Sequence, residues 1–145
     1  MKKIFLTLTA AILMGSMSLS AQTINTLENG RYSISVGDVT LTVDAARGGK
    51  VVSYKYQDQE ILSTTRMPNS FGSTFWTSPQ KEWNWPPVPE FDTKPFNAEV
   101  KDGVLVLTGE KSARFGYRIR KEFSADKKDN AIVIKYTIIN ESGEK

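Results

Sequence analysis

Aromatic and amide side chains are concentrated in one segment of the chain, residues 71–91 (FGSTFWTSPQKEWNWPPVPEF). The segment contains all three tryptophans of the chain and two amides between them: Trp76, Gln80, Trp83, Asn84 and Trp85. Sugars present apolar C–H faces and rings of hydroxyl groups, so their binding sites combine flat aromatic rings with planar hydrogen-bonding groups. The segment therefore has the residue types of a sugar-binding site, although nothing in it specifies a reaction.

The spacing of the tryptophans predicts which of them are exposed. Trp83 and Trp85 flank Asn84, so in an extended chain both would face the same way and form one aromatic platform. Trp76 follows two phenylalanines closely and is expected to fill the open end of a sandwich. The alternative is that the segment packs as a hydrophobic plug, with two of the three tryptophans in the core.

Two arginines outside the segment could complete such a site. Arg118 and Arg120 lie on the polar face of a predicted strand, Arg114–Phe123, whose other face is apolar and would belong to the core. They could line the floor of the site, and the alternative is a solvated outer face. Glu82 and Glu90 are the carboxylates nearest to the tryptophans. A glycosidase needs two carboxyl groups at a fixed separation, which the sequence does not define.

Histidine and cysteine are absent from the chain. Their absence excludes histidine-based triads, the common zinc sites, thiolate metal sites and disulfides. The acidic residues Asp126, Asp129 and Glu141 lack the ligand spacing of a calcium-binding loop. We therefore expect no metal site and no cofactor. Any acid–base chemistry would have to use carboxylates, lysine or tyrosine.

Residues 1–21 have the three parts of a secretory signal peptide. They begin with a basic pair, continue with an apolar run over residues 4–14 and end in the small residues SMSLSA. Cleavage after Ala21 would leave a domain of residues 22–145 in the periplasm or outside the cell. The apolar run is shorter than the about 20 residues that a bilayer span needs, so we expect cleavage and no membrane span after it, and the alternative is a retained membrane anchor. Cleavage also lowers the formal net charge of +3 by two, which argues against nucleic acid as a partner.

The rest of the sequence predicts β-strands. Apolar and polar residues alternate over 32–36 and 39–43 across Gly37-Asp38, a pattern typical of a β-hairpin. Asp102-Gly103 predicts a second hairpin in the same way. We expect an all-β fold, an antiparallel β-sandwich with one long Trp/Pro-rich loop.

Within that loop, prolines set the predicted path. Pro79–Trp83 could form one helical turn, with Ser78 as its N-cap and proline at the first helical position. Pro86-Pro87 and Pro89 favour extended polyproline II geometry.

The last predicted strand, Ala131–Ile139, is apolar on both faces over much of its length and is expected to be a central strand covered on both sides. The sequence then stops at Lys145 without a capping element. We expect it to be the N-terminal portion of a longer protein, and the alternative is a complete small sandwich. In the first case the strand would be left as an apolar edge, and the chain would tend to associate.

Four blocks of the sequence carry a resemblance to a known family: VDAARGGKVVSYKYQDQEILS, RMPNSFGSTFWTSPQKEWNWPP, FGYRIRKEF and IKYTIINES. Over Leu41–Ser142 the chain resembles an exported bacterial family of unknown function, related to aldose 1-epimerases and other galactose-mutarotase-like β-supersandwich proteins. The second block is the most specific. A full domain of that family is longer than this chain, so the resemblance implies that the chain is the first half of such a domain.

The resemblance implies a concave antiparallel sheet that binds carbohydrate. The expected function is an exported carbohydrate-binding or carbohydrate-processing domain. Related members place an arginine and an asparagine near the sugar, and Arg66 and Asn69 occupy a comparable position. Epimerases use a histidine and a glutamate from the later part of their domain. This chain has no histidine and ends before the part that would carry the glutamate. No catalytic residue is therefore carried over, and we expect no catalysis by this chain alone. The alternative function is a structural or protein-interaction module whose Trp/Pro loop packs on a partner.

Overall fold

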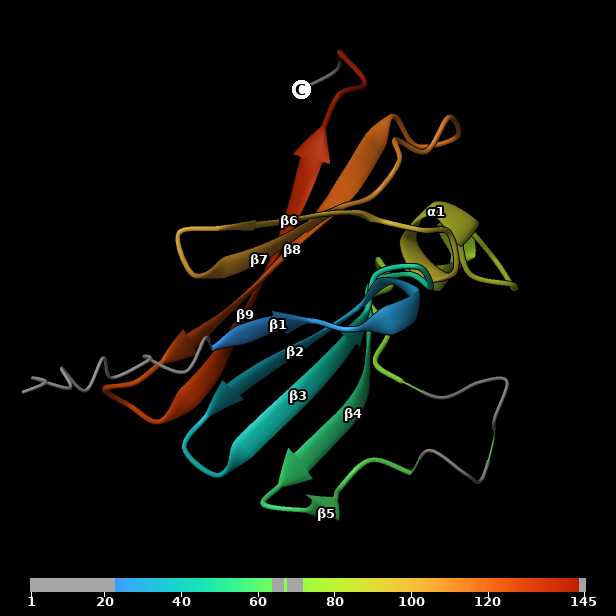
Figure 1. Cartoon of the computed structure of the whole chain (residues 1–145). Coiled ribbons are helices and arrows are strands. Elements are labelled where there is room, and N and C mark those ends of the chain that lie inside the picture. The colour runs from blue at the N-terminus through green and yellow to red at the C-terminus, as the bar shows by residue number, and fades with distance from the viewer. Residues whose placement is uncertain (1–22, 64–66, 68–71, 144–145) are drawn as a thin grey trace, which may run out of the picture.

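The computed structural model describes residues 23–63, 67 and 72–143 of the chain. They form two antiparallel β-sheets, one of five strands in the order β1-β2-β3-β4-β5 and one of four strands in the order β6-β7-β8-β9 (Figure 1). The strands are β1 (Ile24–Thr26), β2 (Arg31–Val36), β3 (Val39–Asp44), β4 (Lys50–Tyr56), β5 (Gln59–Glu60), β6 (Asn97–Lys101), β7 (Val104–Thr108), β8 (Tyr117–Asp126) and β9 (Ala131–Asn140). The all-β, antiparallel sandwich predicted from the sequence is confirmed.

Both predicted hairpins are present. Strands β2 and β3 pair from Val36 opposite Val39, across Gly37-Asp38. Strands β6 and β7 join at Asp102-Gly103, where both residues have positive φ, 50° and 76°. Two consecutive positive φ values define the tight turn whose twist matches that of the flanking strands, which explains the choice of Asp-Gly.

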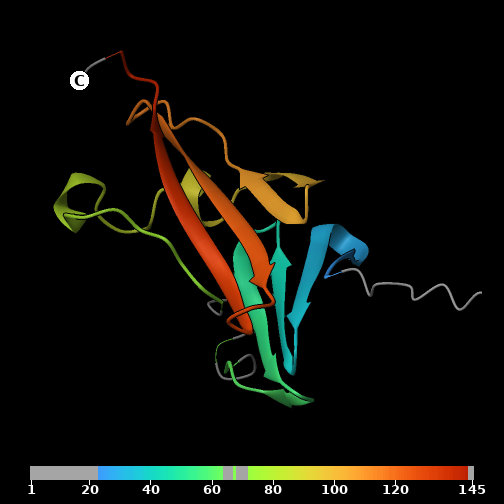
Figure 2. The same cartoon turned by 90° about the vertical axis from the view of Figure 1, so that its left-hand side faces the viewer.

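The core lies between the two sheets. Figure 2 shows the sheets from the side, with β8 and β9 running alongside the strands of the five-stranded sheet. The central side chains are fully buried and come from both sheets: Ile34, Val43, Leu105, Leu107, Ile119 and Phe123. Each such side chain contributes about 1.5–3 kcal/mol by leaving water, so alternation along the strands is enough to hold the two sheets face to face.

The last strand differs from the prediction. β9 was expected to be central, but within the described residues it pairs only with β8 and lies at the edge of the four-stranded sheet. Val133 is 46% exposed and Ile138 is 51% exposed. A continuous apolar run is compatible with a central strand or with an edge, because periodicity does not report how many neighbours a strand has. The prediction of a strand covered on both sides is therefore wrong for this structure.

Two short helical turns interrupt the Trp/Pro-rich loop: a 3₁₀ turn, η2 (Gln80–Glu82), and one turn of helix, α1 (Pro89–Asp92). The predicted turn is present, but Pro79 precedes its first residue and no side chain caps it. Pro89 begins α1 and does not continue a polyproline II path, consistent with the preference of proline for the first helical turn. Among the described residues no helix has the length and apolar character to cross a membrane.

Candidate functional site

The tryptophans are exposed in a different combination from the one predicted. Trp83 is 6% exposed, whereas Trp76 and Trp85 are 42% and 69% exposed. The expected platform of Trp83 and Trp85 is therefore wrong, and so is the burial expected for Trp76. The exposed pair lies nearly at right angles, with ring centroids 5.8 Å apart and an interplanar angle of 82°.

The backbone at Asn84 explains why Trp83 and Trp85 do not form one platform. Asn84 has a φ of 59°, in the left-handed region, so the chain from Trp83 to Trp85 is not extended and the two rings do not share a face. Asparagine tolerates this conformation better than most residues. Its backbone N–H donates to the carbonyl of Gln80, which closes the turn.

Trp83 is held inside the loop by hydrogen bonds of its indole N–H and of its backbone carbonyl. Its indole Nε1–H donates to the Thr77 carbonyl over 2.9 Å. Its own carbonyl accepts a hydrogen bond from Arg114 Nη1 at 3.3 Å, and the other terminal nitrogen of Arg114 donates to the Glu82 carbonyl. Trp83 is therefore a structural residue that positions Trp85.

Trp76 is fixed by a buried ion pair. Its Nε1–H donates to Asp92 Oδ1 over 2.9 Å, and the same oxygen lies 3.1 Å from Lys50 Nζ. Asp92 and Lys50 are 8% and 7% exposed, so both charges are desolvated and depend on each other. Because the N–H of Trp76 is already occupied, this indole offers a ligand mainly its ring face.

A second buried cation lies between the sheets. Lys121 is 1% exposed, and its Nζ donates to the carbonyls of Gly48 at 2.7 Å and Gly49 at 3.3 Å. The ammonium also lies over the ring of Phe96, 5.0 Å from the centroid. Burial lowers the pKa of Lys121 to about 8, with Asp92 opposing the shift and Lys50 adding to it. A group this deeply buried joins the sheets and does not contact a ligand.

Lys50, Asp92 and Lys121 were not predicted from the sequence as functional or structural residues. Strand alternation could have predicted the burial of Lys121, because this residue falls between Ile119 and Phe123 on the apolar face of β8. The pairing of Lys50 with Asp92 had no local signal, since the two residues are far apart in the sequence.

Arg118 and Arg120 are not brought together with the tryptophans. They alternate with Tyr117, whose hydroxyl contacts the aromatic loop at Thr77 Oγ1 over 3.2 Å, so the two arginines lie on the opposite face of β8. Arg118 pairs with Glu141 at 2.8 Å, and Arg120 lies 3.5 Å from a carboxylate oxygen of Glu122. The two arginines thus lie on an outer face, as in the alternative, and both form ion pairs there.

The remaining predicted residues divide into two groups. Gln80 and Asn84 are exposed on the turn that precedes Trp85. Arg66 and Asn69 lie outside the described residues.

Beside the loop is a small pocket of about 290 Å³, lined by residues of the proline-rich stretch and by Trp83, Glu90, Ser112 and Arg114. Partial burial raises the pKa of Glu90, but its hydrogen bond and ion pair with Lys94, 2.9 Å away, outweigh this and lower the pKa overall. An ionised, paired carboxylate is a poor general acid. Within the described residues no group of acidic side chains is arranged to hold a metal ion.

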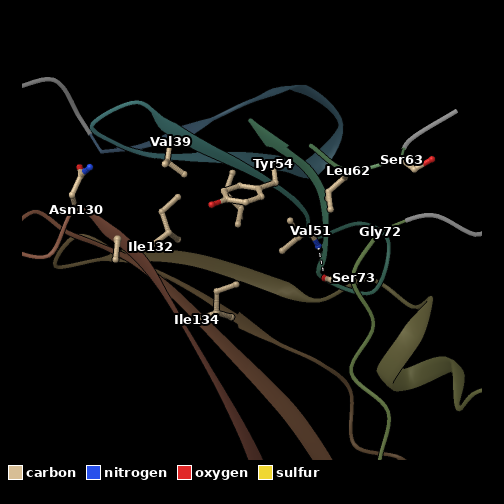
Figure 3. A pocket seen from close by; sticks show the side chains of 12 residues that line it. Val39, Val51, Tyr54, Leu62, Ser63, Gly72, Ser73, Asn130, Ile132 and Ile134 are labelled. Carbon is tan, nitrogen blue, oxygen red and sulfur yellow. Dashed lines mark hydrogen bonds between the residues drawn. The ribbon is translucent and has the colours of Figure 1, made fainter. Parts of the chain in front are cut away.

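A larger pocket lies elsewhere, between the two sheets, with a volume of about 750 Å³. Figure 3 shows Val39 and Tyr54 pointing into it from the five-stranded sheet, and Ile132 and Ile134 from β9 on the other side. Its walls are mostly aliphatic, which is unlike the polar environment that sugar hydroxyls require. Sequence patterning predicted these faces as core and gave no sign that they leave a cavity.

Comparisons with protein-family models, with curated proteins and with solved structures find no match to this chain. The resemblance to mutarotase-like proteins therefore stays a prediction.

Proposed function

We propose that the chain is an exported carbohydrate-binding domain of mutarotase-like type, and that it binds sugar through Trp76 and Trp85 without catalysing a reaction. The observation that carries this proposal is the exposure of two indoles fixed at right angles, one of which, Trp85, is 69% exposed. Burying a large aromatic ring is favourable, so an aromatic ring held in solvent by an ordered loop is typical of a binding surface.

The chemistry of the surface fits a sugar ring. The C–H face of the sugar would stack on Trp85, with Trp76 forming an adjoining wall. The amides of Gln80 and Asn84 would exchange hydrogen bonds with hydroxyl groups. Because buried contacts of Trp83 and Asp92 hold the loop and the Trp76 ring in place, little conformational entropy is lost on binding.

A binding role without catalysis agrees with the state of the nearby carboxylates. Glu90 is paired with Lys94 and has a lowered pKa, whereas a glycosidase acid needs a raised one. Glu82 is exposed on the 3₁₀ turn. We expect no acceleration of anomer exchange, measured by NMR, and no hydrolysis of any glycan that binds.

The test is a glycan array followed by titration of tryptophan fluorescence with each glycan that binds. Trp85→Ala should weaken binding by at least about tenfold, as expected when a stacking aromatic is removed from a site. Tyr56→Ala is the matched control, because Tyr56 is 51% exposed and lies at the far end of β4, next to β5. The proposal fails if no glycan changes the fluorescence, or if both variants bind as the wild type does.

A protein-interaction role is the second candidate, and the exposed edge of β9 favours it. The half-exposed Val133 and Ile138 lie on a strand with one strand neighbour among the described residues. This role involves a different surface from the tryptophan pair, so the two functions can be tested separately.

A further inference from the structure

The structure points to a second copy of this chain as the partner of β9. We propose that two copies pair their β9 strands antiparallel about a two-fold axis at Tyr136, which would join the two four-stranded sheets into one. This interface is separate from the tryptophan surface and does not depend on the proposed sugar binding.

β9 has the properties of a strand that accepts another strand. It is 10 residues long, contains no proline and has one charged side chain, Lys135. The free edge of a sheet presents N–H and C=O groups that can pair with another chain, and natural edges are usually shortened or charged to prevent this.

The other edges in the described part of the chain are protected in those ways. β1 has three residues and β5 has two. β6 has five, including the exposed charges of Glu99 and Lys101. β9 is therefore the edge on which strand addition would bury the most apolar surface.

The sequence of β9 reads similarly in both directions about Tyr136, which favours a second copy over an unrelated strand. Residues 133–139 are VIKYTII. In an antiparallel pair centred on Tyr136, Ile134 lies opposite Ile138 and Val133 lies opposite Ile139. Each apolar side chain within this stretch then meets an apolar side chain of the other copy on the same face of the sheet.

The charges select the same register. Centring the pair on Lys135 would place the two lysines directly opposite each other, which is destabilising. Centring it on Tyr136 places Lys135 opposite Thr137, and each Lys135 keeps Glu122 of its own copy at 3.5 Å. Centring it on Thr137 would place Lys135 opposite Ile139.

Engineered cysteines test the register directly, because the chain has no cysteine of its own. Lys135→Cys and Thr137→Cys are purified separately, mixed and oxidised. Opposite residues have β-carbons about 4.5–5.5 Å apart, close enough for a disulfide after small adjustments. We expect the mixture to give a covalent dimer and each variant alone to give much less. Efficient cross-linking of Lys135→Cys alone would place the axis at residue 135 and overturn the proposal.

Sedimentation of the cysteine-free chain tests association itself. We expect a monomer–dimer equilibrium, with a dissociation constant raised roughly tenfold by Thr137→Lys, which sets two pairs of lysines opposite each other. Adding Lys135→Glu to this variant should restore the dimer through opposite charges. Thr26→Lys, on the exposed edge strand β1, is the matched control and should leave the dimer unchanged. A monomer at every concentration, or equal weakening by both threonine variants, overturns the proposal.

Discussion

The two ends of the sandwich are held together by different kinds of contact. At the end that carries the aromatic loop, polar groups are buried and paired: Lys121 with the Gly48 carbonyl, and Asp92 with Lys50 and Trp76. At the other end, around the 750 Å³ pocket, the sheets meet mainly through aliphatic side chains. Directional contacts fix the position of the loop, whereas apolar contacts hold the sheets together and leave space between them. The two ends should therefore respond differently to substitution and to pH.

The largest effect is expected from removing Asp92. Asp92→Ala leaves Lys50 buried without its partner and removes the acceptor of the Trp76 indole. We expect the free energy of unfolding to fall by about 4 kcal/mol, measured by urea denaturation. Asp58→Ala, in an exposed turn, is the control and should have almost no effect. A loss below about 1 kcal/mol for Asp92→Ala would mean that the ion pair does not hold this end.

Substitution of apolar residues should distinguish the core from the wall of the pocket. Leu107 is fully buried, so Leu107→Ala should cost about 3 kcal/mol through lost burial and a new cavity. Ile132 is partly exposed and already lines a pocket, so Ile132→Ala should cost only about 1 kcal/mol. If urea denaturation showed that Leu107→Ala and Ile132→Ala lower the free energy of unfolding equally, the pocket would be closed in solution.

The pH dependence of stability should report on the buried lysine. Burial lowers the pKa of Lys121 from 10.5 to about 8, so the folded protein releases this proton at a lower pH than the unfolded chain does. Between pH 8 and pH 10 the unfolded state binds more protons, and stability rises with pH. We expect the difference in unfolding free energy between the wild type and Lys121→Met to grow by about 2 kcal/mol over this range in favour of the wild type. If the unfolding free energies of the wild type and Lys121→Met changed with pH in the same way, the pKa of Lys121 would not be lowered in the folded protein.

The smallest effect on stability is expected at the proposed contact residue. Trp85→Ala should change the unfolding free energy by less than about 0.5 kcal/mol, because the ring is mostly in solvent. Trp83→Ala should cost about 3 kcal/mol, since it removes a buried ring and its hydrogen bond to Thr77. If the two losses were similar, the division into a structural and an exposed tryptophan would be wrong.

Features of the fold that depend on neighbouring residues could be predicted from the sequence. The hairpins at Gly37-Asp38 and Asp102-Gly103 follow from local turn chemistry, and the inner face of β8 follows from an alternation that Lys121 alone interrupts between Tyr117 and Phe123. Both signals are contained within a few residues, so no knowledge of the rest of the fold is needed.

The features that were predicted wrongly or missed also have specific physical causes. One left-handed residue, Asn84, separates the faces of Trp83 and Trp85, and a sequence pattern cannot show which asparagine adopts that conformation. The Lys50–Asp92 pair joins a strand to a helical turn across the loop, so it becomes visible only when the chain is folded. The aromatic composition of the site and the exposure of Trp85 were thus predictable, but the exposure of Trp76 and the burial of Trp83 were not.

The contact between Lys121 and Gly48 also bears on the order in which the protein folds. It joins residues 73 positions apart, whereas every strand pair in the described structure joins consecutive strands. Each sheet can therefore assemble locally, and docking the sheets is the step that closes the long loop and strips water from the ammonium group. Asp92 of the loop pairs with Lys50 of β4 beside this ammonium group, so the indole of Trp76 is fixed only once this region has come together. The aromatic surface is thus expected to form last, as a product of docking the sheets.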